Sequence, residues 1–258
     1  MDLHLTGRRA FVSGSTQGIG YAIARALLEE GATVVINGRS DERVRAAVAS
    51  LPGKASGIAA DFADPAQVDE LIAQLGAVDI LINNVGLFEV APFGSLTDDD
   101  WHRYLDVNLM SAVRLSRHVL PGMLERGWGR IISVSSESGV NVPADMVHYG
   151  VAKAGLIALG NGLAKLTRGT EVTVNTILGG PTYSDGVANT VEHIAAAQGM
   201  AVDDLKGAIA AGNQTSLLQR FLEPAEIANL AVYLASPLSS ATNGAALRAD
   251  GGVLTAML

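Results

Sequence analysis

Short runs of β-branched and other apolar residues alternate along the chain with longer Ala- and Leu-rich stretches of helical period. The expected strands lie at residues 10–13, 33–36, 57–60, 78–82, 130–134, 172–177 and 245–248. The expected helices lie at residues 18–30, 42–50, 65–75, 98–125, 147–167 and 224–235. Strands that alternate with helices predict βαβ units and a parallel sheet.

Two of the expected strands are apolar at every position instead of at every second one. They read Val-Val-Ile at 34–36 and Ile-Leu-Ile at 80–82, which is typical of strands covered by helices on both faces. No Pro- and Ser-rich linker divides the chain, and no internal repeat is found. The pattern therefore predicts one doubly wound α/β domain over residues 1–258.

Residues 183–221 depart from this alternation. They contain no convincing strand, a helix-like piece at 188–198, and glycines at 186, 199, 207 and 212. A long insertion between a strand and the next helix is usually functional and is often a lid. The alternative is a surface excursion without a role.

Composition and charge exclude several classes of protein. Of 258 residues, 48% are hydrophobic, which excludes a disordered chain. The net charge of −8 argues against a nucleic-acid surface, and no basic cluster suggests a membrane surface. The chain has no cysteine, its five histidines are scattered, and we expect no metal site. Because no apolar run approaches ~18 residues and residues 1–4 form no signal segment, we expect a cytoplasmic protein.

A glycine-rich turn follows the first expected strand and precedes a helix. It reads Gly14-Ser15-Thr16-Gln17-Gly18-Ile19-Gly20. Gly14 permits a tight turn, Gly18 a close approach to a pyrophosphate, and Gly20 close packing of helix on sheet. The helix N-terminus then offers free N–H groups to the phosphates. The turn predicts dinucleotide binding in a Rossmann fold, although three glycines alone also suit a purely structural turn.

Arg39 bears on the choice between the two nicotinamide dinucleotides. It stands 19 positions after Gly20, where NAD-binding versions of the fold have an acidic residue for the ribose 2′-hydroxyl. A guanidinium suits a phosphate dianion, because its planar fork makes paired charge-assisted bonds. Arg39 favours NADP(H) over NAD(H), with a surface pair to Asp41 as the alternative.

Tyr149 and Lys153 are four residues apart in an expected helix and therefore share one face. A nearby ammonium favours the phenolate and is expected to lower the tyrosine pKa from ~10, which suits acid–base chemistry. Serines at 133, 135, 136 and 138 lie at the carboxyl end of an expected strand, where ligands bind in doubly wound sheets. One of them could hydrogen-bond a substrate oxygen, but chemistry does not choose among the four.

In combination, these residues resemble the classical short-chain dehydrogenases/reductases (SDR family) over essentially the whole chain. The matching motifs are residues 13–20, Asp61, Asn83-Asn84-Val85-Gly86, Asn108, Ser136, Tyr149-x3-Lys153, Gly180-Pro181-Thr182 and Asp250-Gly251-Gly252. The resemblance implies a Rossmann fold with a seven-stranded parallel sheet flanked by helices on both faces. It also implies a homotetramer, in which the helices at 101–125 and 147–167 pair with symmetry mates.

The resemblance further implies a role for each matching residue. The family's serine stands thirteen positions before its tyrosine, which selects Ser136 to polarise the substrate oxygen. Tyr149 would exchange a proton with the substrate, Lys153 would depress the Tyr149 pKa and bind the nicotinamide ribose, and Asn108 would hold a water connected to Lys153. For Asn108 the alternative is an interior amide bonded to backbone.

Further residues are implied to contact the cofactor. Asp61, with the Phe62 backbone beside it, would bond the adenine, while the Asn84 backbone and Gly86 would lie against the adenosine ribose. The remaining positions are Gly14, Ser15, Thr16, Gln17, Gly18, Ile19, Gly20, Thr182 and Ser184. Gln17 replaces the basic residue often found in NADP-preferring members.

We therefore expect an NADP(H)-dependent oxidoreductase that interconverts a small carbonyl compound and its alcohol. Imine or enoyl reduction on the same fold is the nearest alternative. A non-catalytic NADP-sensing regulator is a third, but it would typically lack the Tyr or the Lys.

Overall fold

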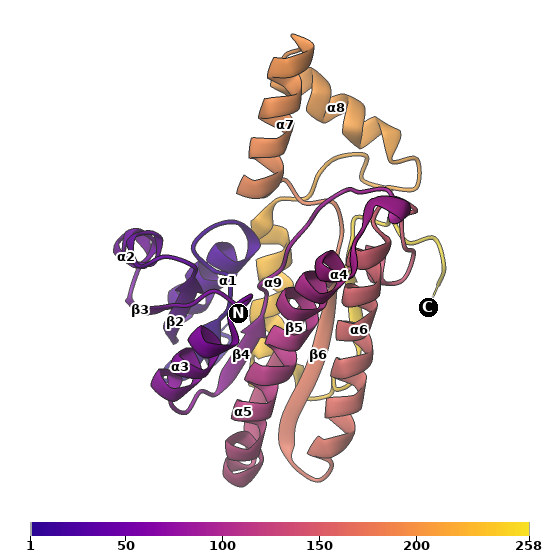
Figure 1. The fold of residues 1–258 in the computed structure, drawn as a ribbon. Helices are drawn as coiled ribbons and strands as arrows, with labels where there is room; N and C mark the ends of the chain where they lie inside the picture. The colour runs from indigo at the N-terminus through magenta and orange to yellow at the C-terminus, as the bar shows by residue number, and fades with distance from the viewer. Residues whose placement is uncertain (1, 258) are drawn as a thin grey trace.

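A parallel sheet of seven strands forms the centre of the molecule (Figure 1). The computed structural model describes residues 2–257, so Met1 and Leu258, the two ends of the expected domain, lie outside the described part. The strands are β1 (Arg9–Val12), β2 (Thr33–Gly38), β3 (Lys54–Ala59), β4 (Ile80–Asn83), β5 (Trp128–Ser136), β6 (Glu171–Gly179) and β7 (Ala246–Ala249). Their order is β3-β2-β1-β4-β5-β6-β7. The expected doubly wound fold and all seven expected strands are confirmed.

Helices cover both faces of this sheet. The α-helices are α1 (Gly18–Glu29), α2 (Asp41–Ser50), α3 (Pro65–Leu75), α4 (Asp98–Leu105), α5 (Ser111–Arg126), α6 (Val147–Ala164), α7 (Asp185–Gln198), α8 (Val202–Gly212) and α9 (Pro224–Ala235). Short helical turns are η1 (Phe93–Ser95), η2 (Asp106–Met110), η3 (Glu137–Gly139), η4 (Lys165–Thr167) and η5 (Pro237–Ser239). The core on one face joins the sheet to α1, α2 and α9, and the core on the other joins it to α3 and α5.

The central strands show why apolar side chains occur at every position. In β4, Ile80 and Ile82 point into the first core, whereas Leu81 points into the second. In β1, Val12 and Phe11 divide between the cores in the same way. Since successive side chains of a strand point to opposite faces, both faces need apolar residues when helices cover both.

The helix expected at 98–125 is interrupted, which corrects the sequence prediction. A π-helical turn, η2, separates α4 from α5. Within it the Asn108 side chain donates to the Tyr104 carbonyl at 3.2 Å and accepts from the Leu87 amide at 3.0 Å. An extra residue in one turn leaves the apolar pattern almost unchanged, so periodicity cannot reveal it.

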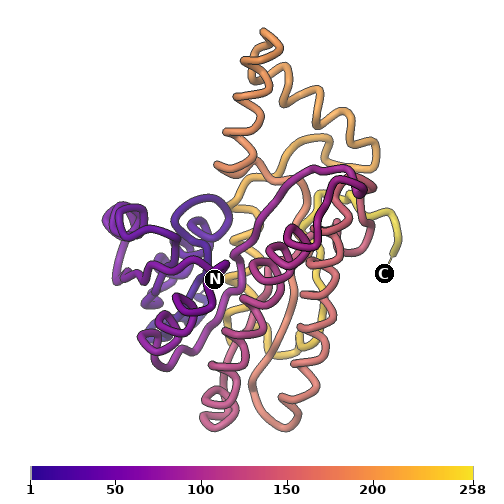
Figure 2. Tube along the Cα trace, in the orientation of Figure 1, coloured from indigo at the N-terminus to yellow at the C-terminus, as the bar shows by residue number. Residues whose placement is uncertain are grey.

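The segment 183–221 contains two helices, of which only the first was expected. α7 and α8 project as a pair beyond the sheet, at the top of Figures 1 and 2. Val191 and Ala195 of α7 form a small separate core with Leu205 of α8. This docking stabilises α8 in spite of Gly207 within it, and the sequence pattern gave no expectation of this second helix. None of the helices between residues 2 and 257 combines the length and the apolar character that a membrane span requires.

Candidate functional site

The glycine-rich turn lies between the carboxyl ends of β1 and β4, where the strand order reverses. Gly14 has φ +60°, and an added Cβ would lie 2.9 Å from the Val85 Cα. At Gly20 an added Cβ would lie 2.4 Å from the Asn84 side-chain nitrogen, which itself donates to the Gly14 carbonyl at 2.9 Å. A side chain at either glycine would therefore push the turn away from β4.

The N-terminus of α1 offers amide groups to an anion. No acidic side chain stands in its first turn, and the Gln17 side chain does not cap it. The Gly18 amide donates to the Asp185 carboxylate of α7 at 2.6 Å. The Ser15 hydroxyl, in contrast, is fully buried and donates to the Val12 carbonyl at 2.6 Å. The Ser15 side chain therefore points into the protein and not toward the expected cofactor site.

Arg39 is exposed directly after β2, beside the same turn. An added Cβ at Gly38 would lie 2.5 Å from the Thr16 Cγ2, so Thr16 and the end of β2 are neighbours. No carboxylate lies within 4.0 Å of the Arg39 guanidinium in the described part of the chain, and the alternative pair with Asp41 is not formed. An exposed guanidinium next to an anion-binding turn suits a second, more distant phosphate.

The other expected cofactor contacts border this region. The Asp61 carboxylate accepts from the Ala63 amide at 2.9 Å, whereas the Asp64 side chain caps α3. Phe62 is buried. The Thr182 hydroxyl donates to the Gly180 carbonyl at 2.9 Å, and Ser184 lies beside Gly18, where an added Cβ would lie 3.4 Å from the Ser184 Cβ. This region combines the amides at the start of α1, the Arg39 cation and the Asp61 carboxylate. These groups suit the phosphates and the adenine amino group of a dinucleotide.

Ser136, Tyr149 and Lys153 meet where β5 ends beside the first turns of α6. The Lys153 ammonium is buried, donates to the Val134 carbonyl at 3.0 Å and lies 5.6 Å from the centre of the Tyr149 ring. The Ser135 hydroxyl donates to the Lys153 carbonyl at 2.8 Å, which fixes α6 on the strand. Of the four serines, only Ser136 influences the pKa of Tyr149, which it lowers, so it is the serine that lies beside the Tyr149 hydroxyl, in agreement with the residue that the resemblance selected.

The pKa values in this cluster differ from the sequence prediction. Burial raises the pKa of Tyr149 to about 12. A hydrogen bond with Ser136 acts to lower this pKa, and the negative charge of Glu137 raises it further. Burial lowers the pKa of Lys153 to about 8, and Glu137 opposes this shift. The expectation that Lys153 lowers the Tyr149 pKa is therefore wrong in this structure. The ammonium points to a backbone carbonyl, while burial penalises the phenolate.

Asn108 lies close to this cluster through Gly86. An added Cβ at Gly86 would lie 2.7 Å from the Asn108 Oδ1 and 3.5 Å from the Lys153 ammonium nitrogen. Both polar groups of the Asn108 side chain bond backbone, as the alternative interpretation held. Its position next to Lys153 nevertheless agrees with the expected placement.

Two residues of the site were missed from the sequence. The Glu137 carboxylate accepts from the Ser136 hydroxyl, and Phe88 packs edge-on against Tyr149 with ring centres 5.7 Å apart. An acidic residue directly after a strand-end serine was a usable signal for Glu137. Phe88 gave none, because it lies in a long loop between β4 and η1.

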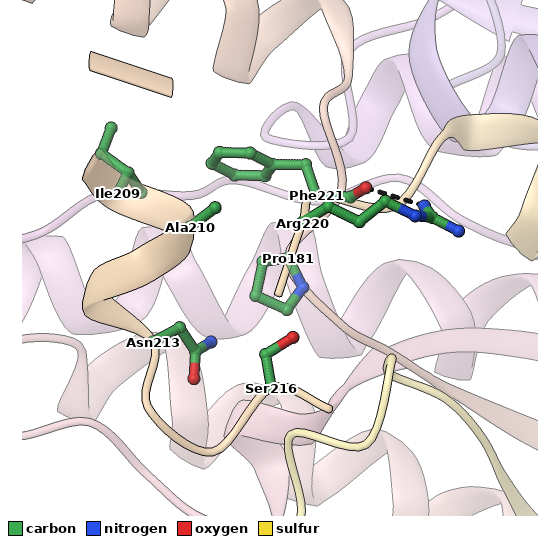
Figure 3. A pocket seen from close by; sticks show the side chains of 7 residues that line it. All are labelled: Pro181, Ile209, Ala210, Asn213, Ser216, Arg220 and Phe221. Atoms are coloured by element: carbon green, nitrogen blue, oxygen red, sulfur yellow. Dashed lines mark hydrogen bonds between the residues drawn. The ribbon is translucent and has the colours of Figure 1, made fainter. Parts of the chain in front are cut away.

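Two hollows lie beneath α8. One of about 60 Å³ separates α8 from the loop that follows β6 (Figure 3). Its lining residues are Pro181, Ile209, Ala210, Asn213, Ser216, Arg220 and Phe221. A neighbouring hollow of about 330 Å³ shares Arg220 and Phe221. Open space therefore separates part of α8 from the body of the protein.

Comparisons with known proteins agree with this architecture. A family model described as enoyl-(acyl carrier protein) reductase matches residues 14–254. The uncharacterized oxidoreductase YvrD of Bacillus subtilis is 43% identical over 263 residues, covering 100% of both chains. D-beta-hydroxybutyrate dehydrogenase of Cupriavidus necator is 35% identical, covering 96% of this chain and 98% of its own. The crystal structure of L-sorbose reductase from Gluconobacter frateurii, complexed with NADPH and L-sorbose, superimposes with a TM-score of 0.93 at 30% identity over 100% of both chains.

These similarities place the chain among the oxidoreductases that carry a parallel, doubly wound sheet. It belongs to the short-chain dehydrogenase/reductase family, and the resemblance drawn from its motifs is confirmed.

Proposed function

We propose that the protein is an NADP(H)-dependent enzyme that interconverts a small carbonyl compound and its alcohol. The observation that carries this proposal is the meeting of Ser136, Tyr149 and Lys153 at the end of β5, beside the glycine-rich turn. It is supported by the NADPH-bound structure of L-sorbose reductase, a neighbour at 30% identity.

In reduction, the chemistry that bound NADPH supplies is hydride transfer to the carbonyl carbon. Ser136 donates a hydrogen bond to the substrate oxygen, and Tyr149 gives it the proton, so that no free alkoxide forms. With a pKa raised to about 12, Tyr149 holds its proton at neutral pH and is suited to the reductive direction. Lys153 would bind the nicotinamide ribose, and Asn108 would hold the water through which Lys153 exchanges protons.

We assign the dinucleotide to the turn Gly14–Gly20. The pyrophosphate would lie at the amides of Ile19 and Gly20 and would reach the Gly18 amide by displacing the Asp185 carboxylate. Arg39 would hold the 2′-phosphate with Thr16 beside it. Asp61, Phe62, Asn84 and Gly86 would bind the adenosine half, and Thr182 and Ser184 the nicotinamide half.

Four properties of the whole chain belong to the same proposal. Residues 1–258 form one catalytic domain in which segment 183–221 is a substrate lid. Four copies assemble into a homotetramer, and the enzyme works in the cytoplasm.

NADPH and NADH oxidation with a panel of ketones, aldehydes, imines and enoyl thioesters tests the proposal. We expect carbonyl compounds to be reduced with NADPH preferred. Reduction of enoyl thioesters alone would favour the activity that the family model's description names, and an absence of turnover with every class would overturn the proposal.

A further inference from the structure

Glu137 is a partly buried carboxylate in the turn η3, directly after Ser136. Its Oε2 accepts from the Ser136 hydroxyl, and its Oε1 accepts from the Ser138 hydroxyl at 3.3 Å. Among residues 2–257, no Lys, Arg or His nitrogen lies within 4.0 Å of this carboxylate. Two neutral hydroxyl groups therefore hold the negative charge.

This arrangement conflicts with the work proposed for Ser136. A serine hydroxyl has one proton to donate, whereas an ionised carboxylate only accepts. When Ser136 turns its proton toward a substrate oxygen, Glu137 loses one of its two donors. Leaving a partly buried charge short of a donor is costly, so a productive complex needs a replacement.

We propose that Glu137 accepts a hydrogen bond from a substrate hydroxyl on the carbon next to the reacting carbonyl, which makes the enzyme selective for hydroxyketones and the corresponding vicinal diols. The inference rests on the proposed function and names its substrate class. Ser136 and Glu137 are adjacent and in contact, so the two substrate oxygens that they bind must also be neighbours. Vicinal oxygens meet that requirement, and a plain ketone does not.

The charges around Glu137 favour a neutral hydroxyl over an ionic group. The Lys153 ammonium interacts with the Glu137 carboxylate, since the charge of Glu137 raises the Lys153 pKa. A substrate carboxylate would be repelled by Glu137 itself, and the Lys153 ammonium weakens the attraction of Glu137 for a substrate ammonium.

The test compares hydroxyacetone with acetone in the wild type and in Glu137→Gln, which keeps the shape and removes the charge. We expect kcat/KM for hydroxyacetone to fall about 10–100-fold, as for loss of a hydrogen bond to a charged group. The kcat/KM ratio of hydroxyacetone to acetone should fall by the same factor, because acetone has no second oxygen for Glu137, and a measurement at pH 6 keeps Lys153 charged in both proteins. Glu125→Gln is the matched control, because Glu125 is exposed in the last turn of α5. This variant should leave the ratio of kcat/KM for the two ketones unchanged.

Equal losses for both ketones would mean that Glu137 only supports the local fold, and would overturn the inference. A wild-type preference for aminoacetone over hydroxyacetone would also overturn it. A binding measurement distinguishes failure of the inference from failure of the proposed function. It records how much each ketone raises the Tm of the Tyr149→Phe variant in the presence of NADPH. Stabilisation by hydroxyacetone that needs Glu137, without wild-type turnover, would sink the proposed function alone. Equal stabilisation by both ketones would sink the inference.

Discussion

Burial moves the pKa values of Tyr149 and Lys153 in opposite directions, and Glu137 raises both. At neutral pH the phenol therefore keeps its proton, while the ammonium, with a pKa of about 8, is close to losing its own. A proton donor next to a group that titrates near the working pH is a suitable pair for transfer to a carbonyl oxygen.

The first prediction concerns the pH dependence of reduction. Lys153 carries its charge below about pH 8 and loses it above, so kcat/KM should fall as the pH rises through that value. Glu137→Gln removes a charge that raises the Lys153 pKa, so the fall should occur at lower pH. Initial rates across pH 6–10 measure both profiles, with Glu125→Gln as the control. If kcat/KM of Glu137→Gln falls at the same pH as that of the wild type, the account is contradicted.

Arg39 gives a second prediction at the residue scale. Arg39→Ala should raise KM for NADPH and change KM for NADH little, because only the 2′-phosphate needs the guanidinium. Solvent and salt screen an exposed charge, so the loss should shrink at high ionic strength. Steady-state kinetics with both cofactors check this. A wild-type preference for NADH would contradict the assignment of Arg39.

For single residues, the sequence predicted which side chains form the cluster but not the direction of their pKa shifts. The Tyr149–Lys153 spacing and the family's Ser–Tyr distance located the cluster that the structure brings together. The direction of the Tyr149 pKa shift depends on burial and on where the Lys153 ammonium points, and neither follows from helical spacing. Glu137 was overlooked because its importance lies in the direction of its side chain.

At the scale of elements, strands and covered helices were predictable because their apolar patterns record which faces are buried. α3 and α9 begin and end where the pattern placed them, each with Pro in its first turn. The π-helical turn η2 and helix α8 were not predictable in this way. The first depends on side-chain bonds of Asn108, and the second on docking against α7.

The segment 183–221 carries the third prediction. A hydrogen bond from Gly18 to Asp185 joins α7 to the phosphate turn, where a pyrophosphate would compete for it, and α8 lies over a cavity of about 60 Å³. Amide exchange in α7 and α8 should be fast in the free protein and should slow when NADPH and a substrate analogue bind, because closure excludes water. α9, buried against the sheet, serves as the internal reference. Equal protection in both states would make the segment a fixed part of the scaffold.

At the scale of the whole molecule, apolar side chains remain exposed along the helices expected to pair. Val151 of α6 is 44% exposed and Leu166 of η4 is 61% exposed. Across a two-fold axis each such side chain would meet the same patch on a second copy. A single substitution in this patch therefore alters both sides of the contact, because both copies carry it.

The fourth prediction follows from this surface. Light scattering at micromolar concentration should give the mass of a tetramer, and Val151→Glu should lower it by placing two like charges near one axis. Circular dichroism checks that the variant is folded. A wild-type mass of one chain would contradict the proposed assembly.

Tyr149→Phe tests the central claim most directly, because it removes one hydroxyl and little else. The account predicts that NADPH-dependent carbonyl reduction falls by about 10²–10⁴-fold, as for loss of a general acid. The dissociation constant for NADPH, measured by fluorescence titration, should stay within a few-fold of wild type. Reduction at near wild-type rates by this variant would contradict the assignment of Tyr149 as the proton donor.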